Sequence, residues 1–155
     1  MNTPQQIAKH TREVFFGGNW TTVNLKDTLA DVTWEQATKQ IYSFNTIAIL
    51  VYHMTYYVTA ITKVLEGEPL NASDKLSFSH PPIESQEDWD AFIESKWADV
   101  EYFINLIEKL PEATLSENFY DEKYGIYYRN LHGLIEHTHY HLGQIVLIKK
   151  ILQNL

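Results

Sequence analysis

Apolar residues recur every three to four positions along most of the chain, a spacing that predicts amphipathic helices rather than strands. Residues typical of helix starts and stops divide this pattern into four main helices. The first begins with Thr3 as N-cap and Pro4 in the first turn, and Gly17-Gly18 interrupts it. The other three are expected from Asn45 or Thr46 to about Glu66, from Ser85 to Pro111, and roughly from Asn130 to Gln153.

Shorter helical pieces and two long connections lie between these helices. Leu25, Leu29 and Val32 restore helical spacing after the glycines, and Thr33 with Gln36 forms a capping-box start. Residues 68–84 and 111–128 are expected to be loops, and no strand alternation, repeat or domain boundary is present. The pattern therefore predicts one all-α domain over residues 1–155, a four-helix bundle with long loops and short extra helical pieces.

Composition narrows the classes of function. Of the 155 residues, 45% are hydrophobic and none is cysteine, which excludes disulfides, thiolate metal sites and a cysteine nucleophile. The net charge of −8, with scattered lysines and arginines, argues against binding to nucleic acid. The first residues show no signal-peptide pattern, and the most apolar run, residues 47–51, is too short to span a bilayer. We therefore expect a cytoplasmic protein without a membrane partner.

Three histidines interrupt the apolar stripes of two predicted helices. His137 and His141 are four residues apart in the last helix, so they lie about 40° apart on the helical wheel and share one face. His53 interrupts the stripe of the second main helix in the same way. Three inward histidines match the ligand number of a catalytic zinc-type site, which leaves a position open for water or substrate. The sequence thus predicts a metal site formed by His53, His137 and His141.

The remaining four histidines are expected to be surface, packing or rim residues. His139 lies about 160° from His141 on the helical wheel, and His132 also falls outside the stripe. His10 is in a polar stretch, and His80 is in a loop.

Two other metal-site templates fail on the sequence. A zincin requires Glu after the first histidine of the HxxxH pair, and Thr138 stands there. A di-iron bundle requires two Glu-x-x-His motifs, whereas Glu136 and His139 form a single copy, with His139 facing away. A mononuclear three-histidine site remains.

These motifs resemble those of the DinB-like superfamily. The resemblance rests on His53 within the tyrosine-rich segment LVYHMTYY, on the motif His137-x-x-x-His141-x-Gly143-Gln144, and on the order of helices. It covers nearly the whole chain and implies an up-down-down-up four-helix bundle, often dimeric, with zinc or nickel held at the three histidine positions. The family includes transferases and isomerases that use bacillithiol or mycothiol. Leu142 departs from the arginine that many members carry there, a change expected to alter rim electrostatics or substrate contacts.

Three hypotheses for function follow. In the first, the protein is a metal-dependent enzyme that transfers a low-molecular-weight thiol to an electrophile or hydrolyses a small molecule, and it forms a homodimer. In the second, the metal only stabilises the bundle. In the third, the histidines form a metal-free hydrogen-bond network in a dimerising module.

The residue that moves protons is not identified by the sequence. Gln144, one turn beyond His141, would support a ligand or bound water. Glu136 is nearly perpendicular to the ligand pair, so a role as base requires a neighbouring helix to leave it facing the pocket. Six tyrosines are candidates to line a cavity or to pack in the core and loops: Tyr52, Tyr56, Tyr57, Tyr124, Tyr127 and Tyr128.

Overall fold

Helices make up the regular structure of this protein, and no strand is present. The computed structural model describes all 155 residues and contains six α-helices and three short 3-10 helices, which confirms the all-α prediction. The α-helices are α1 (Thr3–Phe16), α2 (Leu25–Leu29), α3 (Trp34–Thr38), α4 (Ile47–Leu65), α5 (Gln86–Glu108) and α6 (Tyr127–Gln153). The 3-10 helices are η1 (Leu76–Phe78), η2 (Glu112–Ser116) and η3 (Glu122–Tyr124).

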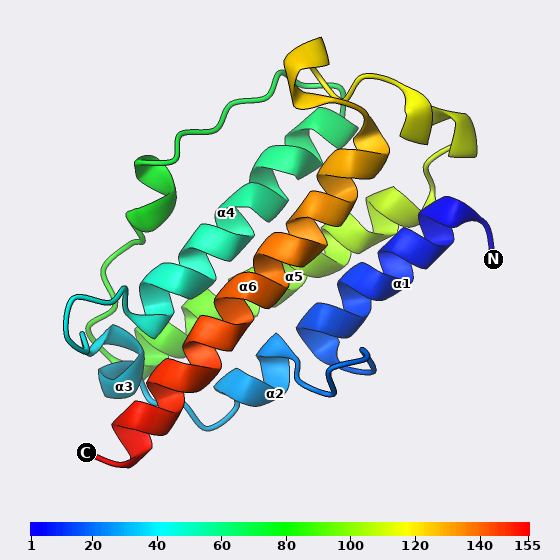
Figure 1. Ribbon diagram of the computed structural model, residues 1–155. Coiled ribbons are helices and arrows are strands. Elements are labelled where there is room, and N and C mark those ends of the chain that lie inside the picture. The colour runs from blue at the N-terminus through cyan, green and yellow to red at the C-terminus, as the bar shows by residue number, and fades with distance from the viewer.

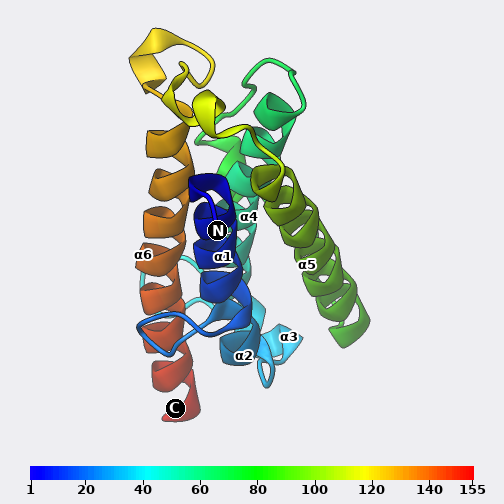
Figure 2. The same cartoon turned by 90° about the vertical axis from the view of Figure 1, so that its right-hand side faces the viewer.

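Four long helices surround a common core. Helix α1 packs on α5 and α6, and α4 packs on the same two helices from the other side, as the two perpendicular views show (Figures 1 and 2). The short helices α2 and α3 lie near the end where α6 finishes. The core is continuous through all of these helices and includes the fully buried rings of Phe15 and Phe103.

Side-chain caps set most of the helix starts. The oxygens of Thr33, Thr46 and Ser85 each accept a hydrogen bond from the backbone N–H three residues on, as the sequence predicts. The first helix differs by one residue, because Asn2 rather than Thr3 is its N-cap and forms a capping box with Gln5. Proline is compatible with both registers, since the first N–H groups of a helix have no partner within it.

Helix α6 begins earlier than predicted, at Tyr127 instead of Asn130. Its N-cap, Ile126, provides no side-chain hydrogen bond, so the sequence carries no start signal there. Instead, the backbone N–H of Tyr127 donates to the carbonyl of Glu117, and the rings of Phe119 and Tyr127 pack edge to face. Tertiary contacts therefore fix this start.

Helix α4 is the most apolar helix of the molecule. By length and composition alone it is long and apolar enough to cross a membrane, because the apolar stretch continues beyond residues 47–51 to Leu65. Its apolar window is 67% buried against the other helices, which is typical of a core helix and makes the length criterion weak evidence for a membrane span. Burial of α4 is what brings His53 into the interior.

Candidate metal centre

The structure brings His53 of α4 together with His137 and His141 of α6. The Nε2 atom of His137 lies 2.9 Å from Nε2 of His53 and 3.1 Å from Nε2 of His141. A tetrahedral ion with bonds of 2.0–2.1 Å would separate its nitrogen ligands by about 3.3 Å. The three imidazoles therefore lie close enough to hold a metal ion, and no fourth His, Asp or Glu joins the group.

Hydrogen bonds on the far side of two rings fix their tautomers. The Ser77 hydroxyl donates its only hydrogen to the carbonyl of Asp74 at 2.6 Å, so it accepts from Nδ1–H of His53 at 2.8 Å. His141 likewise donates from Nδ1 to the side-chain oxygen of Gln144 at 2.7 Å. Both rings thus direct an Nε2 lone pair toward His137, and the expected supporting role of Gln144 matches this geometry.

These two lone pairs cannot both be satisfied by neutral His137. Its imidazole carries one hydrogen, so it can donate to at most one of the two neighbouring Nε2 atoms. Its other nitrogen, Nδ1, is buried without a hydrogen-bond partner. Buried polar atoms are normally paired, which makes this cluster under-satisfied without a cation at its centre.

Burial also favours the neutral, metal-binding form of two of the histidines, His137 and His53. Desolvation lowers the pKa of His137 to about 4, reinforced by the neighbouring charges of His141 and His53. Burial lowers the pKa of His53 as well. At neutral pH both rings are therefore uncharged, with one nitrogen lone pair available, as metal ligation requires.

The connection that follows α4 folds back along it and covers one side of the histidines. Tyr56 and Tyr57 hold this segment, because the Tyr56 hydroxyl accepts from the backbone N–H of Ser73 and the Tyr57 hydroxyl donates to Asp74 at 2.9 Å. Phe78, farther along the same segment, stacks on His53 with 4.1 Å between ring centroids. The predicted loop therefore supplies hydrogen-bond and stacking partners to a cluster whose three histidines all lie on helices.

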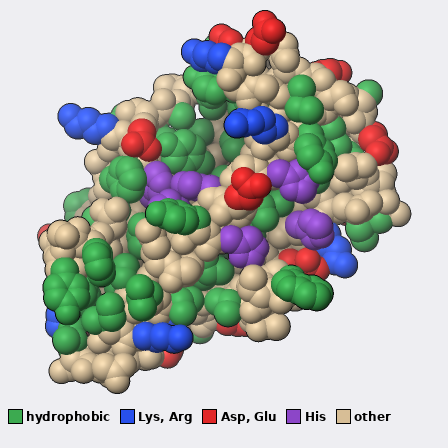
Figure 3. All heavy atoms as spheres, in the orientation of Figure 1, with side chains coloured by type: hydrophobic (Ala, Val, Ile, Leu, Met, Phe, Trp, Pro, Cys, Tyr) green, Lys and Arg blue, Asp and Glu red, His purple; other side chains and the backbone are tan.

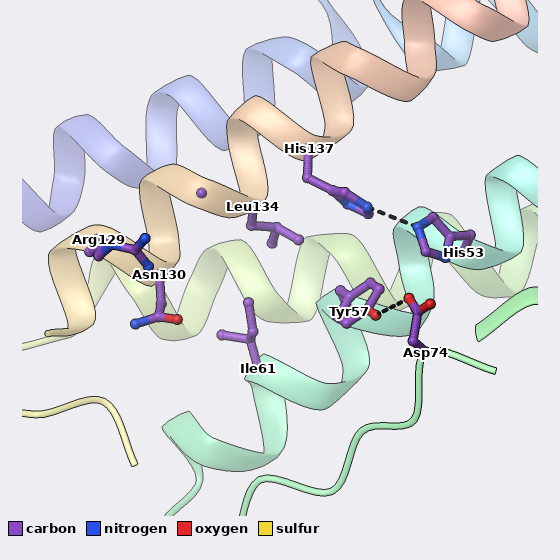
Figure 4. A pocket seen from close by; sticks show the side chains of 9 residues that line it. His53, Tyr57, Ile61, Asp74, Arg129, Asn130, Leu134 and His137 are labelled. Carbon is purple, nitrogen blue, oxygen red and sulfur yellow. Dashed lines mark hydrogen bonds between the residues drawn. The ribbon is translucent and has the colours of Figure 1, made fainter. Parts of the chain in front are cut away.

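A pocket of about 410 Å³ opens onto the histidines between α4 and α6, within the usual size range of small-molecule sites (Figure 4). His53 and His137 stand at one end, beside Tyr57 and Asp74. The remaining lining residues are Ile61, Arg129, Asn130, Gly133 and Leu134. In the space-filling view, histidines lie beside a hollow on this face (Figure 3).

The histidines predicted to be peripheral remain outside the metal group. His132 and His139 lie with His10 in a separate surface groove next to Trp20, and His80 packs near Tyr52.

Most of the other residues considered from the sequence do not line the pocket. Glu136 is exposed and does not line the pocket, so it is not placed to act as a base. Of the six tyrosines, only Tyr57 lines the pocket. Leu142 is buried in the core at 2% exposure and does not line the pocket. Asp74, Ser77 and Arg129 are contributors that the sequence did not reveal, because none interrupts an apolar stripe.

Gly133 forms part of the pocket wall in the middle of α6, and we predict that Gly133→Ala stabilises the protein. A Cβ at this position would meet no atom within 4 Å. Alanine in a helix interior is favoured over glycine by about 1 kcal/mol, which for this chain length raises Tm by about 2–4 °C. Thermal unfolding of the metal-free protein measures the shift.

Gly125→Ala is the matched opposite case. Gly125 has φ +77°, and its added Cβ would lie 3.2 Å from the Arg129 side chain, so this variant should be destabilised. If Gly133→Ala had a lower Tm than the wild type, the open space beside Gly133 in the pocket wall would be refuted.

Comparison with protein-family models, curated proteins and solved structures gives no match for this chain.

Proposed function

We propose that this protein is a metal-dependent enzyme that acts on a small molecule at a mononuclear three-histidine site. The observation that carries the proposal is that the Nε2 atoms of His53, His137 and His141 converge on one point. In two of these rings the other nitrogen, Nδ1, is hydrogen-bonded: to Ser77 in His53 and to Gln144 in His141. Histidine ligands commonly donate their second N–H to a neighbouring acceptor, which orients the ring and raises its basicity. Imidazole ligands suit zinc and nickel, the two ions we propose.

The absence of a fourth ligand favours catalysis over a purely structural ion. Structural zinc sites are closed by four protein ligands, whereas catalytic sites use three and keep a position for water or substrate. Here the group contains three histidines, and the pocket reaches two of them. A small molecule in the pocket would therefore meet the open side of the ion.

The proposed family is the DinB-like superfamily, and the proposed architecture is its up-down-down-up four-helix bundle. In the ribbon, α1 and α6 run in one direction and α4 and α5 in the other, and the long connection between α4 and α5 returns along the molecule (Figure 1). This order supports the proposal together with the HxxxHxGQ motif of His137 to Gln144.

Transfer of a low-molecular-weight thiol is the reaction class we favour, with hydrolysis as the related alternative. A bound divalent ion would lower the pKa of a thiol or water toward neutrality. We assign Asp74 to accept the released proton on Oδ2, since Oδ1 is occupied by the Tyr57 hydroxyl. In thiol transfer a carbon–sulfur bond forms, the bond to the leaving group breaks, and the proton leaves with that group.

Elemental analysis of protein purified without a nickel column tests the metal site. We expect one divalent ion per chain in the wild type and none in His141→Ala. His139→Ala is the matched control, because His139 is on the same helix but outside the group, and it should retain the ion. A wild type without metal, even after reconstitution with zinc or nickel, would overturn the proposal.

A screen of thiol cosubstrates with monochlorobimane then tests the reaction class. Conjugation that requires the bound metal supports thiol transfer. No turnover with any thiol would exclude transfer for the thiols tested and shift the proposal to hydrolysis.

A further inference from the structure

The end of the pocket opposite the histidines carries a cation without a carboxylate partner. Of the two arginines, Arg12 forms a bidentate pair with Glu101, whereas Arg129 takes part in none of the ion pairs of the molecule. Asp74, the pocket's own carboxylate, is bonded to Tyr57 at the histidine end. The guanidinium is therefore free to pair with a ligand in this pocket.

The first turn of α6 positions the backbone and the aliphatic stem of Arg129, which is exposed at the pocket. The Asn130 side chain donates to the carbonyls of Tyr124 and Ile126, which ties the turn to the preceding loop. The stem of Arg129 approaches Gly125 so closely that a Cβ there would lie 3.2 Å from it. The missing side chain of Gly125 thus makes room for the arginine at the pocket.

One face of α6 links this cation to the metal ligands. Arg129, Gly133 and His137 follow each other at intervals of four residues, and all three line the pocket (Figure 4). Eight residues of helix separate Arg129 from His137 by about 12 Å along the axis. Gly133 lies between them and leaves the wall open, because a Cβ there would contact nothing.

We infer that Arg129 is a specificity residue that binds a carboxylate or phosphate at the far end of the substrate, while the reacting group lies at the histidines. The inference rests on the proposed function and defines its substrate class: elongated, anionic small molecules. Guanidinium groups recognise both anions through paired hydrogen bonds, which are stronger than those between neutral groups. In a protein of net charge −8, an unpaired arginine also offsets the general repulsion of anions locally.

Two thiols that differ only in their terminal group test this inference on cobalt-loaded protein. 6-Mercaptohexanoate and 6-mercaptohexanol both place sulfur on the metal, and the thiolate–cobalt absorption measures their affinities. We expect the carboxylate to bind about tenfold more tightly, a preference that weakens with added salt. Arg129→Gln should remove the preference, leaving cobalt content and mercaptohexanol affinity unchanged.

The controls separate this inference from the proposed function. Lys123→Gln removes a neighbouring cation that does not line the pocket and should keep the preference. Equal affinity of the two thiols for the wild type, or a preference that survives in Arg129→Gln, would overturn the inference with the metal site intact. Failure of the wild type to bind cobalt would refute the metal site itself, and this inference with it. Phosphate competition against 6-mercaptohexanoate compares the two anion classes.

Discussion

Zinc at about a thousandfold excess over its dissociation constant should raise the free energy of unfolding of the wild type by about 4 kcal/mol. For a chain of this length, that corresponds to an increase in Tm of about 8–16 °C. The physical reason is that an ion bound by His53 of α4 and by His137 and His141 of α6 joins two helices that are distant in sequence. It also satisfies nitrogen lone pairs that face each other in the metal-free cluster.

His53→Ala gives the most informative comparison for this effect. The variant keeps the HxxxH pair on α6 and removes the ligand from α4, so zinc should stabilise it by less than about 1 kcal/mol at the same concentration. His139→Ala, which changes a histidine outside the group, should respond to zinc like the wild type. Calorimetry with and without a chelator measures all three proteins. A zinc-dependent Tm that is equal in His53→Ala and wild type would show that the ion binds elsewhere.

The histidine cluster was predictable because each of its members breaks a strong pattern. His53, His137 and His141 occupy positions where helical periodicity calls for an apolar side chain, and the same periodicity places the last two on one face. The packing of α4 against α6 then brings His53 together with the His137–His141 pair. The sequence alone could not predict that α4 and α6 pack side by side with His53 level with His137 and His141. That alignment depends on how the side chains of the two whole helix surfaces fit together.

Helix starts follow the same logic. Thr33, Thr46 and Ser85 were identifiable because a short polar side chain before an apolar periodic run caps a helix through local hydrogen bonds. The start of α6 at Tyr127 has no such residue and depends on Glu117 and Phe119, which contact it from the preceding connection. A start fixed by tertiary contacts carries no local signal in the sequence.

The residues that surround the three histidines could not be predicted, for a different reason. Asp74 and Ser77 belong to a connection without periodicity, and Arg129 is an exposed charged residue like many others on a helix surface. Asp74 and Ser77 matter because the segment after α4 folds back and bonds to Tyr57 and His53. Arg129 matters because it lines the same pocket as His137. Position in space, rather than residue type or spacing, distinguishes them from other polar residues.

Asp74→Asn should lower thiol-transfer turnover by about 10²–10⁴-fold, the usual contribution of a positioned general base. Asparagine keeps the shape of the side chain and can still accept the hydrogen bond from Tyr57, but it cannot take up a proton at the second oxygen. Because Asp74 is outside the histidine group, metal content should not change. Turnover under saturating thiol, measured beside elemental analysis, separates a loss of proton transfer from a loss of metal.

Tyr57→Phe gives a graded test of the same assignment. Its phenol donates to Asp74 at 2.9 Å, and burial followed by this hydrogen bond raises the pKa of Tyr57, so the tyrosine positions the carboxylate as a donor. Removing the hydroxyl should release Asp74 from its place beside the histidines and reduce turnover less than Asp74→Asn does. Asp121→Asn, an acidic loop residue away from the pocket, should have no effect. Turnover of Asp74→Asn within twofold of the wild type, with full metal content, would refute the assignment and leave Asp74 as a structural link between α4 and the segment that covers it.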